Sequence, residues 1–268
     1  MFRYPLFALA CLAALGHSRP SAAQVRSRPA TPLAPAAVSD LSFQKAEALT
    51  SPFGWRTGQG IEYQMLDAKG KLTSTWRYRV LAVSTDGGGK QTKRVTTSIV
   101  RLKSGYYDLR NRLLVQQDLT FRLRRDTIYT DGLTEINYEA LKSFRDRRIA
   151  YSGTPLAWPA KPKVGAVLPR GGVSVQVSSP MVAIAKVETT LAQRTIKSGP
   201  EPVTVPAGSF SCYVVESQRT QATVARADMV IKATSRQLDY YAPTIGIVKT
   251  EYFDKGGKLM QSRVLSKL

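Results

Sequence analysis

The chain almost lacks the residue types on which most catalytic and metal sites depend. Its 268 residues include one histidine and two cysteines. His17 and Cys11 both lie in an N-terminal segment, residues 1–23, that is typical of a secretory signal peptide. A mature chain without this segment keeps Cys212 alone. Such a chain has no Ser-His-Asp or Cys-His catalytic group, no intramolecular disulfide and too few ligands for the usual zinc sites.

Three features in order support the signal peptide. Arg3 precedes an apolar run over residues 5–15, and the small residues 21–23 then predict cleavage after Ala23. The run is shorter than the roughly 20 residues that a membrane-spanning helix needs. A buried helix of the mature fold and lipid attachment at Cys11 are the alternatives. The sequence therefore predicts an exported protein, periplasmic or extracellular, that is not transmembrane.

Acidic residues are also scarce, with 19 Asp and Glu against 39 Lys and Arg, a formal net charge of +20. An excess of this size favours polyanionic neighbours. For an exported protein these are anionic lipid or acidic glycan, and we expect no nucleic acid partner. The alternative is that the charge serves solubility alone, because net charge carries no information about a site.

Cofactor motifs are missing as well. The sequence has neither a P-loop nor a dinucleotide fingerprint, so it predicts no cofactor, no metal and no assigned catalytic residue. Carboxylate chemistry or a Ser-Lys pair remains open. Asp228 and Asp239 are the acids considered, and the sequence gives neither of them a partner.

After a linker rich in Pro, Ala, Ser and Arg at residues 24–45, the pattern changes to short alternating runs. Residues 75–83 and 118–124 place apolar side chains on one face and two arginines on the other, with the period of two that strands have. If these two strands are neighbours, their outer faces form one compact basic patch. The arginines are Arg77, Arg79, Arg122 and Arg124.

The remaining pattern predicts one antiparallel β domain over residues 46–268. Short turn-linked runs cannot form parallel crossovers. We expect an all-β fold, either a curved antiparallel sheet or a partly open barrel or sandwich, with one short helix over 135–144 capped by Thr134. The Pro/Gly-rich residues 153–172 are either a domain boundary or a loop within one sheet. Further strands are expected at 173–177, 185–195, 201–205, 209–217, 225–233, 237–241, 247–253 and 258–266.

Residues 61–74 and 250–262 resemble each other, because both place Glu-Tyr before an Asp-containing turn that ends in Lys-Leu. Shared hairpin chemistry explains this similarity, since Asp and Gly favour turns. Duplication of half of the domain is the alternative.

The stretch DYYAPTIGIVKTEYFDKGGKL (239–259) predicts a strand, a corner, a second strand and a hairpin turn. Pro243 fixes its own φ, and Gly246 permits whatever dihedral angle the corner needs. Tyr240 and Tyr241 either pack within the sheet or form a stacking platform for a sugar or base. Cys212 lies between apolar neighbours on one strand face, which is typical of a buried, unreactive thiol.

These stretches carry a family resemblance. VPAGSFSCYVVES (205–217), YYAPTIGIVKTEYFDKGGKL (240–259) and PKVGAVLPRGGVSVQV (162–177) resemble the TapB-like family of exported bacterial β proteins. The similarity covers residues 161–268 well and the N-terminal half loosely. Thr244 departs from the family, which often has glycine there, but threonine fits a type I turn. The resemblance implies an envelope-associated all-β domain without known catalytic residues, and it supplies no activity.

The sequence is compatible with three functions. The first is a non-enzymatic envelope protein that binds an apolar ligand or a protein partner, and a deep apolar cavity would favour it. The second is a basic surface that docks on acidic lipid or glycan, and contiguous arginines would favour it. The third and least favoured is a hydrolase with two carboxylates about 5–10 Å apart in a cleft.

Overall fold

The computed structural model describes residues 50–86, 96–141, 144, 147–226 and 229–268. These residues belong to one compact unit, residues 47–268. The expected signal peptide, the expected linker and Asp228 lie outside the described residues.

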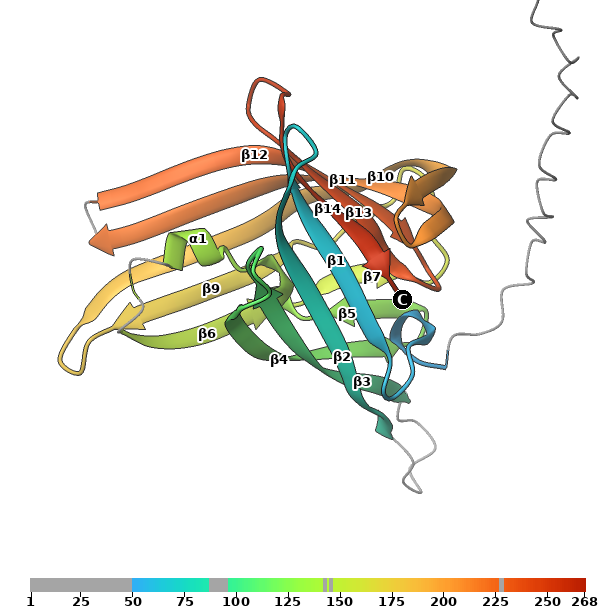
Figure 1. The fold of residues 1–268 in the computed structure, drawn as a ribbon, viewed down its shortest axis with the longest axis horizontal. Helices are drawn as coiled ribbons and strands as arrows, with labels where there is room; N and C mark the ends of the chain where they lie inside the picture. The colour runs from blue at the N-terminus through green and yellow to red at the C-terminus, as the bar shows by residue number, and fades with distance from the viewer. Residues whose placement is uncertain (1–49, 87–95, 142–143, 145–146, 227–228) are drawn as a thin grey trace, which may run out of the picture. The chain divides into compact units, whose positions relative to one another are not determined.

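Fourteen strands form one antiparallel sheet in the order β6-β9-β10-β11-β12-β13-β14-β1-β2-β3-β4-β5-β7, with β8 beside β10 (Figure 1). Their bounds are β1 (Gly60–Asp67), β2 (Leu72–Asp86), β3 (Thr97–Tyr107), β4 (Leu113–Arg124), β5 (Thr127–Thr130), β6 (Arg148–Thr154), β7 (Leu156–Pro159), β8 (Val167–Leu168), β9 (Gly171–Ser178), β10 (Ala183–Val205), β11 (Gly208–Arg226), β12 (Met229–Ala242), β13 (Gly246–Phe253) and β14 (Leu259–Lys267).

The sheet nearly closes on itself. Its two edge strands, β6 and β7, are consecutive in the sequence and are separated only by Pro155. Proline cannot donate a ladder hydrogen bond, so it suits the point where the chain leaves one edge and joins the other. The expected all-β class, a curved antiparallel sheet or partly open barrel, is confirmed.

The helix expected over residues 135–144 is wrong in its length and its cap. The chain forms a short 3-10 helix, η2 (Gly132–Glu135), and a single helical turn, α1 (Tyr138–Leu141). Asp131 caps η2 by accepting a hydrogen bond from the backbone N–H of Leu133. Helical geometry stops at Ile136, whose ψ is 136°. The residue before it, Glu135, is buried in the interior. A tertiary contact has therefore overridden helical spacing.

Three strand predictions also differ from the structure. The strands expected separately at 185–195 and 201–205 form one strand, β10. The strand expected at 225–233 is the end of β11 followed by the beginning of β12, which pair with each other as antiparallel strands. The connection expected at 153–172 contains β7 and β8. Leu156, Ala157 and Trp158 of β7 are all buried, so this strand has no alternation by which to recognise it.

Aromatic side chains fill one end of the sheet's interior. Phe53, from the 3-10 helix η1 (Pro52–Gly54), packs 5.2 Å from Trp55 and 6.1 Å from Tyr241, measured between ring centroids. Trp158 packs 5.2 Å from Tyr241. The cavity left among these rings is about 30 Å³, which has room for little more than water. This end is therefore a packed core.

One hairpin turn occurs three times. Asp67, Asp108 and Asp254 each accept, through Oδ1, the backbone N–H groups of the residues two and four positions later. The residue three positions later has positive φ in every case, at Gly70, Asn111 and Gly257. The turn at Asp108 lies outside the two similar stretches 61–74 and 250–262, so its recurrence favours shared turn chemistry as the source of their similarity.

Candidate functional site

A cleft opens at the other end of the interior, beside α1. Its volume is about 660 Å³, and residues from α1 and η2, β1–β3, β11, β12 and the β13–β14 turn line it. In Figure 1, α1 lies between two parts of the sheet, with the β11–β12 hairpin on one side and strands β9 and β6 on the other. The apolar side of the segment, including Ile136 and Leu141, packs on Val173, Val175 and Val187 of β9 and β10. The inner face of β11 and β12 is left open beside it.

Aromatic rings form one wall of this cleft. Tyr138 of α1 stacks on Tyr106 with a centroid distance of 5.2 Å and meets the edge of Trp76 at 6.0 Å. The Tyr138 hydroxyl donates a hydrogen bond of 2.8 Å to Oε1 of Gln117. Met65 adds an apolar side chain. Two further hydrogen bonds hold the wall, from the Ser74 hydroxyl to the Tyr106 hydroxyl and from the Trp76 indole N–H to the Ser104 hydroxyl, so the polar atoms of the rings are engaged and their apolar surfaces face the cleft.

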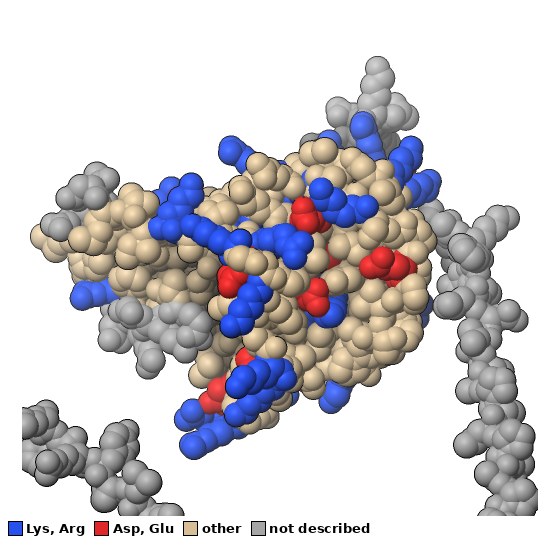
Figure 2. Space-filling view, turned by 90° about the horizontal axis from the view of Figure 1, so that it is seen from above, with Lys and Arg blue, Asp and Glu red and all other residues tan. Residues whose placement is uncertain are grey.

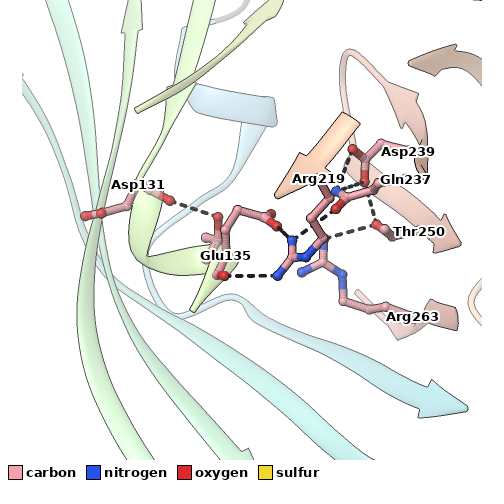
Figure 3. Close-up of polar contacts among 8 residues, drawn as sticks. Asp131, Glu135, Arg219, Gln237, Asp239, Thr250 and Arg263 are labelled. Atoms are coloured by element: carbon pink, nitrogen blue, oxygen red, sulfur yellow. Dashed lines mark hydrogen bonds and ion pairs between the residues drawn. The ribbon is translucent and has the colours of Figure 1, made fainter. Parts of the chain in front are cut away.

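A buried ion pair lies at the base of the cleft. Nη1 of Arg219 donates to the carboxylate of Glu135 and to Oε1 of Gln237, the latter at 3.0 Å (Figure 3). Nη2 of Arg219 donates to the Glu135 carbonyl at 3.2 Å. These bonds join η2 to β11 and so fix the segment that carries α1.

The polar network continues behind this pair, away from the cleft. Nε2 of Gln237 donates to both carboxylate oxygens of Asp239, at 3.1 and 3.0 Å, and the Thr250 hydroxyl donates to Asp239 at 2.7 Å. Arg263 donates to the Thr250 hydroxyl at 3.1 Å. Burial, together with the charge of Glu135, raises the pKa of Asp239 despite the opposing effect of Arg263.

The two interior carboxylates do not share the cleft. Glu135 lines it, whereas Asp239 is not among the described lining residues and is buried under its own hydrogen bonds. Arg219 donates to Glu135, Gln237 donates to Asp239, and a hydrogen bond joins Arg219 to Gln237, so the two carboxylates are linked through these side chains. This arrangement resembles a structural network more than a catalytic pair.

The two tyrosines considered as a stacking platform point in different directions. Tyr241 is in the core, where its hydroxyl donates a hydrogen bond of 3.0 Å to the Pro159 carbonyl. Tyr240 is half-buried, and its hydroxyl donates 2.9 Å to Glu251. Neighbouring residues of a strand face opposite sides of a sheet. The pair therefore offers no common surface for a sugar or base.

The four arginines considered as one patch lie on strands that are not neighbours, because β3 separates β2 from β4. Along β3, the pair from β2 lies beside residues 103–105 and the pair from β4 beside residues 97–99. Arg77 also forms a 2.8 Å ion pair with Glu62. Burial alone would raise the pKa of Glu62, but the hydrogen bonds from Arg77 and Ser266 lower it. One compact patch is therefore not formed, and anion binding by Arg77, Arg79, Arg122 and Arg124 stays a prediction.

The outer surface seen in Figure 2 has the same mixed character. Lys and Arg lie there beside Asp and Glu, without one continuous cationic field. Ion pairs on β10–β13 include Lys186 with Glu188 and Lys249 with Glu251, both at 2.6 Å.

Sequence reasoning did not find Arg219 or assign the cleft wall. A signal exists in β11, where the inward positions change from Val215 to Ser217 and then Arg219, all buried. β12 shows the same change from Tyr241 to Asp239 and Gln237. A strand face that turns from apolar to polar partway along marks the place where packed core gives way to the polar network behind the cleft.

Within the described ranges, no group of three His, Cys, Asp or Glu side chains could hold a metal ion. Across that same part of the chain, the helices are too short or too polar to cross a membrane.

Solved structures show the same fold. A protein of Parabacteroides distasonis, named as a candidate lipoprotein, matches with a TM-score of 0.64 and 20% identity over 79% of this chain and 95% of its own. A protein of Bacteroides fragilis, named as a candidate exported protein with a YmcC-like fold, matches with a TM-score of 0.58 and 18% identity over the same shares. No curated protein matches the chain significantly.

The family assignment rests on most of the described domain. The model of the DUF3108-like family matches residues 56–265, from just before β1 to the last strand, β14. The match includes η2, α1, Arg219 and every strand that lines the cleft. The chain belongs to the DUF3108-like family.

Proposed function

We propose that this protein is an exported, non-enzymatic binding protein of the bacterial envelope, and that the cleft beside α1 is its ligand site. The expected signal peptide and the resemblance of residues 161–268 to the TapB-like family support export. The names of the two similar structures, a candidate lipoprotein and a candidate exported protein, support it further.

The observation that carries the proposal is the contrast between the two ends of the interior. One end is filled by aromatic side chains around a cavity of about 30 Å³. The other keeps about 660 Å³ open, within the roughly 300–1,000 Å³ range of ligand sites. A sheet that filled its whole interior would have no such opening.

The lining favours an apolar ligand or the apolar side chains of a protein partner. Trp76, Tyr106 and Tyr138 offer ring faces and edges, while Met65 and Met260 offer adaptable thioethers. The charges of Glu135 and Arg219 are matched to each other. They can orient a polar group of the ligand without demanding a charged one.

Filling the cleft tests the proposal. Gln221 of β11 lines the cleft, whereas Thr220 faces the other side of the same strand. Gln221→Trp should reduce the affinity for the fluorescent probe N-phenyl-1-naphthylamine at least about tenfold, because the indole occupies the site. Thr220→Trp is the matched control and should bind as the wild type does. Equal binding of the probe by both variants would place its site elsewhere.

Docking on acidic lipid or glycan is the alternative proposal. It is supported by the net charge of +20 and by arginines on the outer faces of β2 and β4. Since β3 separates the two arginine pairs, such docking would depend on the overall charge of the surface.

A further inference from the structure

β12 extends beyond the strand that pairs with it. Its pairing with β13 runs from Ala242, opposite Gly246, to Arg236, opposite Phe253. β13 ends there, and the chain turns towards β14. Residues 229–235 of β12 pair with β11 on one side, and on the other side no described strand accompanies them. This segment, the free edge of β12, therefore presents backbone N–H and C=O groups with no ladder partner.

The free edge has the composition of a strand that pairs with another chain. Met229, Val230 and Ile231 are 45%, 54% and 69% exposed, and the segment contains no proline. Exposed β-branched residues on an unpaired edge favour addition of a further strand.

The free edge also borders the cleft. Ala233, Thr234 and Ser235 line the cleft together with residues 253–256, where β13 stops. Residues 229, 231, 233 and 235 have the same parity as the buried residues 237, 239 and 241, so they share the inner face of the sheet, which is exposed to solvent at Met229 and Ile231. A strand laid here would continue the line of β13. Every second side chain of that strand would then point towards the aromatic wall.

We propose that the free edge of β12 binds an extended, acidic segment of a partner protein as an added strand. The inference rests on the proposed function, because the site is the same cleft, and it specifies the ligand as a polypeptide. Unpaired backbone groups along a strand are matched by another extended chain and by few other ligands. Lys232 is the exposed cation of the free edge, and Lys255 and Lys258 are exposed cations of the adjoining turn, so they favour carboxylates on the partner.

A second copy of this chain fits the edge less well. Antiparallel pairing of two free edges about their centre would place Lys232 opposite Lys232 of the other copy. Like charges directly opposite each other destabilise a strand pair. Lysine in the middle of an exposed edge is a common device against self-association. The occupant inferred is therefore a different protein.

A labelled heptapeptide, Val-Thr-Val-Glu-Val-Thr-Val, tests the inference by fluorescence anisotropy with the full mature chain. Its central glutamate would lie opposite Lys232, and its valines would face the cleft. Two N-methylated forms, with the methyl groups on odd or on even residues, remove the amide donors from one edge or the other. A strand added to β12 uses one edge only. One form should lose at least about tenfold in affinity, and the other should bind like the parent peptide.

A charge reversal gives the second measurement. Lys232→Glu should lower the affinity for the glutamate peptide at least about threefold. It should raise the affinity for a peptide with lysine in place of glutamate. Lys163→Glu changes the net charge equally on an exposed loop outside the cleft lining and should have little effect. Equal effects of both variants, or equal losses for both N-methylated forms, would overturn strand addition.

The naphthylamine probe separates this inference from the proposed function. If the probe binds in the cleft but the heptapeptide does not, strand addition is wrong and the cleft remains a ligand site. If neither binds, both proposals fail.

Discussion

Removing Arg219 should destabilise the domain more than removing any arginine on its outer surface. In Arg219→Met, the carboxylate of Glu135, which is 4% exposed, loses its counter-charge, and Oε1 of Gln237 loses a donor. Breaking a buried pair by removing one partner costs about 3–5 kcal/mol. At about 2–4 °C per kcal/mol for a domain of this size, the melting temperature should fall by about 6–20 °C.

The double variant Glu135→Leu/Arg219→Met should recover most of that loss. Replacing both members of a buried pair by apolar residues of similar volume is often neutral or stabilising. Recovery should be incomplete, because Nη2 of Arg219 also serves the Glu135 carbonyl. The buried carboxylate, and not the missing side-chain volume, is the main cause of the expected loss.

Urea unfolding, followed by circular dichroism, gives the free energies needed for this comparison. Arg236→Met is the matched control, since Arg236 pairs with Glu216 at 3.5 Å but is half exposed. Its cost should stay within about 1 kcal/mol. If Arg219→Met costs no more than Arg236→Met, or if the double variant is as unstable as the single one, the reasoning about an uncompensated charge is wrong.

The remaining predictions concern the corner, the thiol and the charge. Gly246 has φ of 108°, and an added Cβ would lie 3.4 Å from the Phe53 ring, so Gly246→Val should cost about 1–3 kcal/mol. Thr244 does not have a positive φ, so Thr244→Gly should cost less than about 1 kcal/mol. Equal melting temperatures for Gly246→Val and Thr244→Gly would contradict this difference. Burial, aided by the charge of Glu201, raises the pKa of Cys212 to about 12. A thiol reagent should therefore label it slowly until urea unfolds the chain, and fast labelling of the native protein would refute burial. At low salt, two quadruple alanine variants should lose the same affinity for anionic vesicles. A larger loss in the variant that replaces arginines would show that those arginines form one binding patch. One variant replaces Arg77, Arg79, Arg122 and Arg124, and the other replaces Lys161, Lys163, Lys255 and Lys258.

Strands could be predicted from the sequence where one face of the strand is buried and the other is exposed to solvent. Residues 74–81 alternate cleanly because β2 has core on one side and solvent on the other, and the alternation ends where the pairing of β2 with β3 shifts register after Val80. β7 could not be recognised, since packing covers both of its faces. The helix was overestimated because Glu135 turns inward to Arg219, a contact that spans 84 residues and has no local signal.

The candidate site was harder to predict than the fold. The cleft is formed by segments from Met65 to Gln261 that meet only through the register of the sheet. The sequence named Asp239 without partners. Gln237 lies two residues earlier on the same face of β12, so alternation could have indicated it, whereas Thr250 becomes evident only once β12 lies beside β13. Strand pairing across long sequence separations is the information that alternation does not contain.

The position of β14 has a consequence for how the protein is made. β14 lies between β13 and β1, and the Ser266 hydroxyl donates to the Glu62 carbonyl 204 residues earlier. In a chain that crosses a membrane from its N-terminus, β1 has no partner on that side until nearly the whole domain has emerged. Contacts of such long range make folding slow and leave strand edges open to aggregation meanwhile. If the chain is exported, its folding is completed only after translocation, and a holding chaperone that covers β1 during that interval would raise its yield.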